Sequence, residues 1–157
     1  MIITHARETD LADILELERA GFDAAEQWSD AAWAEELASP DRYVLARLDR
    51  EARIIGVATF SCVAEMADLH RVIVRPDARG QGIGASLVRA GLDWASAVGG
   101  RRMLLEVRPD NQPAVDLYRG LGFEPVTTRR DYYGPGRDAL VMLRTLRDAD
   151  AWSVECA

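Results

Sequence analysis

Apolar and polar residues recur along this chain with two different periods, and these periods predict its secondary structure. Near the N-terminus, residues 1–7 read as a short strand. Residues 10–20 then carry apolar side chains at helical spacing, directly after Thr9, whose hydroxyl suits it to cap a helix. A second helix is expected from Ser29, another capping residue, through residue 37. The first part of the chain is therefore predicted as one strand followed by two helices.

The middle of the chain shows the composition of strands. Residues 43–48 and 53–64 are apolar, β-branched runs. The polar turn of residues 49–51 between them predicts an antiparallel hairpin. A further strand is expected over residues 68–74, immediately before a glycine-rich stretch.

The last part of the chain continues to alternate between helices and strands. Residues 82–98 form the amphipathic pattern of a long helix. Beyond it we expect a strand, a short helix and a closing pair of strands, at residues 102–107, 112–121, 123–129 and 139–146. The order β-α-α-β-β-β-α-β-α-β-β predicts an α/β fold in which helices cover a mixed sheet. We assign residues 1–147 to a single domain and residues 148–157 to a C-terminal tail.

Composition and charge narrow the classes of partner. The 157 residues have an ordinary hydrophobic share of 48% and a formal net charge of -7. Because phosphate backbones attract basic surfaces, this balance argues against a nucleic acid and is compatible with a cationic substrate. The two cysteines, Cys62 and Cys156, lie far apart without a metal-ligand pattern, so no metal is expected. No apolar run is long enough to span a bilayer, and we expect a soluble, cytoplasmic protein without a membrane partner.

The strongest local signal is a strand that enters a glycine-rich turn and then a long helix, over residues 72–84. Free N–H groups at a helix N-terminus bind phosphate, so the turn predicts an anion site. A P-loop would need a lysine after the last glycine, and Gly84 is followed by Ala85 and Ser86. Residues 80–85 also satisfy the dinucleotide pattern G-x-G-x-x-A, with Glu106 near the end of the next strand. Against that reading, five residues separate the strand from the first glycine, and the motif comes late in the chain.

The same stretch resembles the acetyl-CoA signature of the GNAT superfamily, Arg-x-x-Gly-x-Gly after a strand ending Val-x-Val-x-Pro. The resemblance covers nearly the whole chain and implies a GNAT fold, a mostly antiparallel mixed sheet of about seven strands flanked by four helices. It implies acetyl-CoA as co-substrate. The backbone groups that would hold its pyrophosphate belong to Arg79, Gly80, Gln81, Gly82, Ile83 and Gly84. The strand residues that would pair with its pantetheine arm are Val72, Ile73 and Val74.

Two side chains are candidates for proton transfer. Glu106 interrupts an apolar strand, and a carboxylate there must be solvated, paired or functional. Tyr118 shares a helix face with Ala114 and Leu121, which suits either a core aromatic or an acid aimed at the coenzyme sulfur. From the residues alone, a structural role and a catalytic role stay open for Glu106 and for Tyr118.

Three motifs together resemble the RimI branch of the GNAT superfamily: Leu-Glu-Val-Arg-x-x-Asn at 105–111, Leu-Tyr-x-x-Leu-Gly-Phe at 117–123 and Arg-Arg-x-Tyr-Tyr at 129–133. The resemblance implies that Glu106 is the general base and Tyr118 the general acid. It also implies that the acceptor is the N-terminal alanine of a ribosomal small-subunit protein. The alternatives are a small-molecule amine as acceptor and a non-catalytic acyl-CoA sensor. The protein is expected to be a monomer or a homodimer.

The resemblance also indicates residues around the acceptor. Asn111 is expected either to cap the following helix or to bind the pantetheine arm. Trp28 borders the acceptor cleft in the branch, although its position before Ser29 also suits a hydrophobic staple. Tyr132 and Tyr133, before a Gly-Pro-Gly turn, are candidates to flank a peptide or to form an ordinary hairpin pair.

Arg71 departs from the RimI pattern, which has asparagine at the matching position beside the acetyl group. A cation there would repel an incoming ammonium at short range, which argues against a peptide acceptor. If Arg71 points away from the acceptor instead, we expect it to pair with Asp68 or Glu106, and this pairing would relieve the repulsion. The two histidines, His5 and His70, are isolated and are assigned structural roles.

Overall fold

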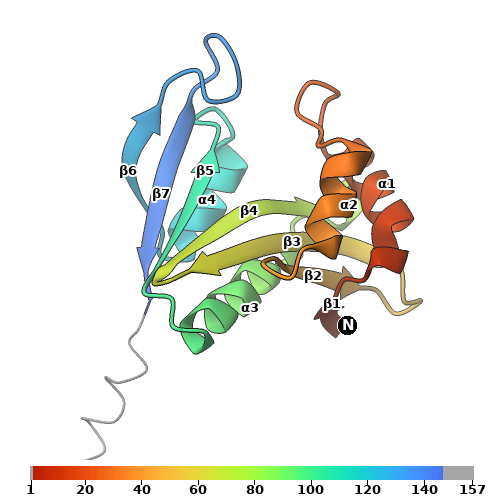
Figure 1. Cartoon of the computed structure of the whole chain (residues 1–157). Helices are drawn as coiled ribbons and strands as arrows, with labels where there is room; N and C mark the ends of the chain where they lie inside the picture. The colour runs from red at the N-terminus through yellow and green to blue at the C-terminus, as the bar shows by residue number, and fades with distance from the viewer. Residues whose placement is uncertain (1, 147–157) are drawn as a thin grey trace, which may run out of the picture. The chain divides into compact units, whose positions relative to one another are not determined.

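A computed structural model describes residues 2–146, and Figure 1 shows the arrangement of their helices and strands. The strands are β1 (Ile2–His5), β2 (Tyr43–Leu48), β3 (Ile54–Val63), β4 (Met66–Val74), β5 (Arg102–Val107), β6 (Glu124–Arg129) and β7 (Ala139–Thr145). The helices are α1 (Leu11–Gly21), α2 (Asp30–Ala38), α3 (Ile83–Ala97) and α4 (Gln112–Gly120), with short 3-10 turns η1 (Glu8–Asp10) and η2 (Pro76–Ala78). This order of helices and strands is the predicted one.

The seven strands form one sheet in the order β1-β2-β3-β4-β5-β7-β6. Strands β1, β2 and β3 pair antiparallel, as do β5, β7 and β6, whereas β4 and β5 pair parallel. The predicted fold class, a mixed and mostly antiparallel sheet with four helices, is therefore confirmed.

The contacts of the chain divide it into two compact units. The first contains the residues up to Ser61 together with residues 70–91, and the second contains residues 62–69 and the described residues from Leu92 onward. The assignment of residues 1–147 to one domain stays a prediction, and the expected tail at 148–157 lies outside the described residues.

In the first unit, helices cover both faces of the strands (Figure 1). On one face, α1 and α2 bury Ile14 and Trp33 in a cluster with Val57 of β3 and Ile73 of β4. On the other face, α3 lies so close to β3 that a Cβ on Gly91 would stand 2.1 Å from the ring of Phe60. Glycine is therefore required at position 91 by close packing rather than by its dihedral angles.

The two predicted helix caps have different outcomes. The Ser29 Oγ accepts a hydrogen bond from the Ala32 N–H at 3.0 Å, which confirms the cap of α2. The cap at Thr9 is wrong, because Thr9 lies inside the 3-10 turn η1. Asp10 bends the chain there by accepting a 2.7 Å hydrogen bond from the Arg7 N–H, and α1 begins one residue later.

In the second unit, alternation along β5 separates a buried face from a partly open one. Met103, Leu105 and Val107 are buried, whereas Glu106 is only partly buried. Helix α4 contributes Tyr118 to the buried side of this unit. The period of two therefore leaves a carboxylate on a strand whose alternate residues belong to the core.

Candidate active site

The glycine-rich turn lies in the first unit, between η2 and α3. Gly80 and Gly82 have positive φ angles of 78° and 77°, a region that other residues rarely adopt. A Cβ at either position would meet nothing within 4 Å, so the backbone borders open space. The first N–H groups of α3 have no partner within the helix, by helix geometry. The turn therefore presents backbone donors next to room for a ligand.

Arg79 anchors this turn to the rest of the first unit. Its Nε donates to the Val74 carbonyl at 3.2 Å, and its Nη2 donates to the Gly21 carbonyl at 3.5 Å. The side chains of Ile73 and Ile83 are buried in the core, so only their backbone groups can contact a coenzyme. Val72, Val74, Gln81 and Gly84 are exposed or partly exposed.

Arg71 of β4 has a different partner from those expected. Its guanidinium forms a bidentate ion pair with Glu18 of α1, with distances of 3.1 Å from Nε and 2.7 Å from Nη2. Nη2 also donates to the Glu26 carbonyl at 2.8 Å. The predicted pairing with Asp68 or Glu106 is thus replaced by a pairing with Glu18, a residue that the sequence analysis did not single out.

Aromatic rings enclose this ion pair. The Arg71 guanidinium lies 3.7 Å from the centroid of Phe22 and 5.1 Å from that of Trp28. Glu18 is 1% exposed and also accepts a 2.9 Å hydrogen bond from the Trp33 indole. The positive charge of Arg71 is neutralised locally, and the network fastens the segment between α1 and α2 to β4.

In the second unit, Glu106 lies next to Arg129. Glu106 pairs with Val141 of β7, and Arg129 pairs with Ala139, two residues away on the same strand. Both side chains therefore project from one face of the sheet. The Arg129 Nη1 lies 3.6 Å from the Glu106 Oε1, and the Glu106 side chain is 20% exposed. The predicted alternatives of a solvated and a paired carboxylate therefore both apply in part.

The surroundings of Glu106 raise the pKa of its carboxyl group. Burial is the main cause, the positive charge of Arg129 opposes it, and the negative charge of Asp68 adds to it. A carboxylate with a raised pKa is a stronger proton acceptor than a solvent-exposed one. The same unit therefore contains a base whose strength is increased by its environment.

Tyr118 of α4 lies in the same unit and is 7% exposed. Its ring packs edge-on against Phe123, with centroids 5.9 Å apart. Asn111 caps α4 by accepting a 3.3 Å hydrogen bond from the Ala114 N–H, which confirms the capping role. The pantetheine role of Asn111 and the acid role of Tyr118 stay predictions.

Tyr132 and Tyr133 form an edge-on pair with centroids 4.9 Å apart and are exposed. The guanidinium of Arg129 lies 5.6 Å from the Tyr132 ring. Burial, and next the negative charge of Glu106, raise the pKa of the Tyr132 phenol. The structure thus brings Tyr132, Glu106 and Arg129 together in the second unit.

Both histidines contact neighbouring side chains, and their structural role stays a prediction. His5 packs edge-on against Tyr43, and the His70 Nε2 lies 2.7 Å from the Ser61 Oγ. Over residues 2–146, no three metal-ligating side chains gather in one place. None of the helices described is both long enough and apolar enough to cross a membrane.

The chain is similar to known proteins in both sequence and fold. The profile of the acetyltransferase (GNAT) family matches residues 9–123. The N-alpha-acetyltransferase RimI of Mycobacterium tuberculosis is 40% identical over 139 residues, covering 85% of either chain. The ribosomal protein bS18-alanine N-acetyltransferase of Escherichia coli K12 is 32% identical over 143 residues, covering 89% of this chain and 94% of the relative. The crystal structure of the ribosomal-protein-S18-alanine N-acetyltransferase from Escherichia coli superposes with a TM-score of 0.85 at 28% identity, covering 94% and 95% of the two chains.

Proposed function

Because the chain belongs to the acetyltransferase (GNAT) family, we propose that it acetylates a protein N-terminus that begins with alanine. Transfer of acetyl from acetyl-CoA to a primary amine is the family's reaction, and the acceptor is the part proposed. The observation that carries the acceptor is similarity over most of the chain to relatives named for N-terminal acetylation, at 40% and 32% identity. A cytoplasmic location and a ribosomal protein as partner belong to the same proposal.

The turn between η2 and α3 fits the pyrophosphate of acetyl-CoA. Positive φ angles at Gly80 and Gly82 leave the backbone open to a ligand, and the N-terminus of the 15-residue helix α3 favours an anion. Residues 79–84 would hold the phosphates, and the backbone of residues 72–74 would pair with the pantetheine arm. The coenzyme supplies an activated thioester, and the chain supplies binding and proton transfer.

Glu106 and Tyr118 suit the two proton transfers of the reaction. An α-ammonium group with a pKa of about 8 must lose a proton before its nitrogen attacks the thioester carbon. Burial raises the pKa of Glu106, which therefore accepts that proton, directly or through water, more readily than an exposed carboxylate. A thiol has a pKa of about 8.5, so the thiolate that leaves needs only a nearby donor. The phenol of Tyr118 would return that proton.

The Glu18–Arg71 ion pair removes an objection to an amine acceptor. An isolated guanidinium beside the acetyl group would repel an ammonium, but Arg71 is matched by a buried carboxylate at 2.7 Å. The departure of Arg71 from the RimI pattern therefore does not by itself argue against a peptide.

A mass-spectrometric acetylation screen tests the proposal. Purified protein and acetyl-CoA are incubated with Ala-initiated basic peptides, with their acidic counterparts and with small amines, and the position of each acetyl group is mapped. We expect α-acetylation of the basic Ala-initiated peptides. Acetylation of small amines alone would establish the small-molecule alternative, and coenzyme binding without any transfer would establish the acyl-CoA sensor.

A further inference from the structure

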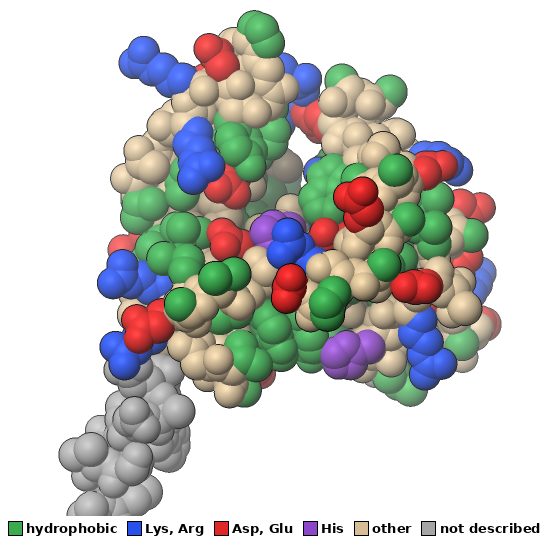
Figure 2. Space-filling model, viewed as in Figure 1, with side chains coloured by type: hydrophobic (Ala, Val, Ile, Leu, Met, Phe, Trp, Pro, Cys, Tyr) green, Lys and Arg blue, Asp and Glu red, His purple; other side chains and the backbone are tan. Residues whose placement is uncertain are grey.

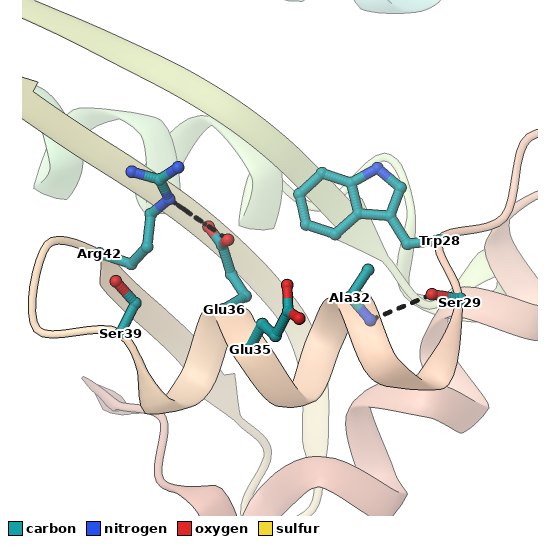
Figure 3. Close-up of a pocket in the computed structure, with 7 residues that line it drawn as sticks. All are labelled: Trp28, Ser29, Ala32, Glu35, Glu36, Ser39 and Arg42. Carbon is teal, nitrogen blue, oxygen red and sulfur yellow. Dashed lines mark hydrogen bonds and ion pairs between the residues drawn. The ribbon is translucent and has the colours of Figure 1, made fainter.

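A groove of about 560 Å³ lies along α2 in the first unit (Figure 3). Trp28 stands at one end and Arg42 at the other, with Glu35 and Glu36 side by side between them. The small side chain of Ala32 leaves room beside the Trp28 ring. The groove therefore combines an aromatic wall with two carboxylates.

The two carboxylates differ in whether their charge is balanced. Glu36 is 12% exposed, its Oε1 lies 3.2 Å from the Arg42 Nε, and it also accepts a hydrogen bond from the Thr59 hydroxyl. Glu35 is exposed, and its carboxylate has no hydrogen-bond or ion-pair partner among the described residues. Because Glu36 and Arg42 cancel one another, the groove keeps one uncompensated negative charge, on Glu35.

Trp28 is the second feature that suits a cation. A guanidinium already lies near its ring, because Arg71 is 5.1 Å from the centroid. The ring is held by Trp33, whose centroid is 5.0 Å away. A cation that approaches an aromatic face gains electrostatic attraction. Trp28 also joins the groove to β4, since Arg71 immediately precedes the residues proposed to pair with pantetheine.

The overall negative charge does not by itself create a binding site for a cation on the face drawn in Figure 2. On the face in Figure 2, acidic and basic side chains are interspersed over the elements of the first unit. The net charge of -7 therefore does not gather into one acidic patch there. A preference for a particular cation has to come from a particular carboxylate.

We propose that this groove binds one basic side chain of the acceptor peptide, between the carboxylate of Glu35 and the ring of Trp28. The inference rests on the proposed peptide acceptor and adds a specificity-determining site beyond the reacting amine. One uncompensated charge matches one arginine or lysine. The groove would therefore select a basic residue at a single position of the peptide rather than basic peptides in general.

A position scan tests this. Ala-initiated peptides carry one arginine at position 2, 3, 4, 5 or 6, and each has a partner with uncharged citrulline at that position. The scan measures kcat/KM for the wild type, for Glu35→Gln and for Glu16→Gln. Glu16 is an exposed residue of α1, so both variants lower the net negative charge by one and alter long-range steering equally.

We expect one position at which arginine is preferred over citrulline by about two- to fivefold, the range of an exposed ion pair. Glu35→Gln should abolish that preference, with the KM for the arginine peptide rising to that of its citrulline partner, and Glu16→Gln should retain the preference. With Glu35→Arg, glutamate should replace arginine as the preferred residue at the same position. Because Glu35 is exposed, the variants should keep the melting temperature of the wild type, which is measured alongside.

The outcomes separate the two proposals. If peptides are acetylated but Glu35→Gln behaves as Glu16→Gln does, the groove proposal is wrong and the peptide acceptor stands. If only small amines react, the peptide acceptor fails and the groove proposal fails with it. If spermidine competes in the wild type but not in Glu35→Gln, and no peptide position prefers arginine, the groove binds a free polyamine and the proposal is overturned.

Discussion

The buried carboxylate of Glu18 makes Arg71→Met an informative substitution in the first unit. Glu18 is 1% exposed and accepts two hydrogen bonds from Arg71 and one from Trp33. Methionine would preserve much of the aliphatic stem but leave the carboxylate with the indole as its only partner from this network. Breaking a buried ion pair in this way costs about 3–5 kcal/mol. Loss of the contacts with Phe22 and Trp28 adds to that cost, since each cation–π contact contributes about 0.5–1 kcal/mol.

The double variant Glu18→Gln/Arg71→Met separates the charge from the packing. Glutamine keeps an oxygen that can accept the hydrogen bond from the Trp33 indole, and it removes the buried charge. Replacing both members of a buried ion pair is often close to neutral, so we expect the double variant to lose only about 1–2 kcal/mol. It should be more stable than Arg71→Met alone, although it carries one more substitution.

Urea unfolding followed by circular dichroism measures these differences. The midpoint should fall sharply for Arg71→Met and recover in the double variant, at an unchanged m-value. Glu18→Gln alone completes the double-mutant cycle and gives the coupling energy of the pair. A loss below about 1 kcal/mol for Arg71→Met, or strict additivity of the two substitutions, would refute the assignment of a buried, charge-coupled pair.

The remaining predictions concern the coenzyme and the chemistry. Gly82→Val forces a β-branched residue to a φ angle of 77° and should weaken CoA binding at least about tenfold by calorimetry, with the circular dichroism spectrum retained. Tyr118→Phe should lower kcat by about 10²- to 10⁴-fold at unchanged CoA affinity, and near-normal turnover would remove the acid role. Burial raises the pKa of Glu106, so the wild-type kcat/KM should fall as the pH drops through that pKa and the carboxylate takes up a proton. The kcat/KM of Glu106→Gln should lack this decrease at low pH. Relative to the wild type, the variant should be slowest at pH values between the Glu106 pKa and the amine pKa of about 8.

Most of the fold could be predicted because the hydrophobic periods are long and regular. Strands β2 and β5 begin and end where the sequence places them, and α3 differs by one residue at either end. The error at Thr9 arose because the neighbouring Asp10 makes the local hydrogen bond instead. Asp10 accepts from the Arg7 N–H, and the 3-10 turn formed there includes Thr9. Which side chain makes such a bond depends on backbone geometry, which a capping preference alone does not contain.

The site was only partly predictable. Glu18 lies four residues after Ile14, on the buried face of α1, and this position was the signal that could have identified it. The pairing of Glu106 with Arg129 depends on the register of β6 against β7, which shifts between Pro125 and Thr127. A shift of one residue moves every side chain beyond it to the other face of the sheet. Strand periodicity cannot reveal where such an irregularity occurs.

Arg71 shows why a charge in a sequence motif is an incomplete guide to the electrostatics of a site. Two unit charges 4 Å apart interact by about 4 kcal/mol at the effective dielectric constant of a protein surface, so an isolated Arg71 would oppose an ammonium strongly. An ion pair that also holds a carboxylate 2.7 Å away acts on a third charge mainly as a dipole, whose field decays faster with distance. The same pair fastens the segment that carries Trp28 to β4. The double variant Glu18→Gln/Arg71→Met removes both charges together, so it should bind basic peptides no more tightly than the wild type, because no repulsive net charge is lost.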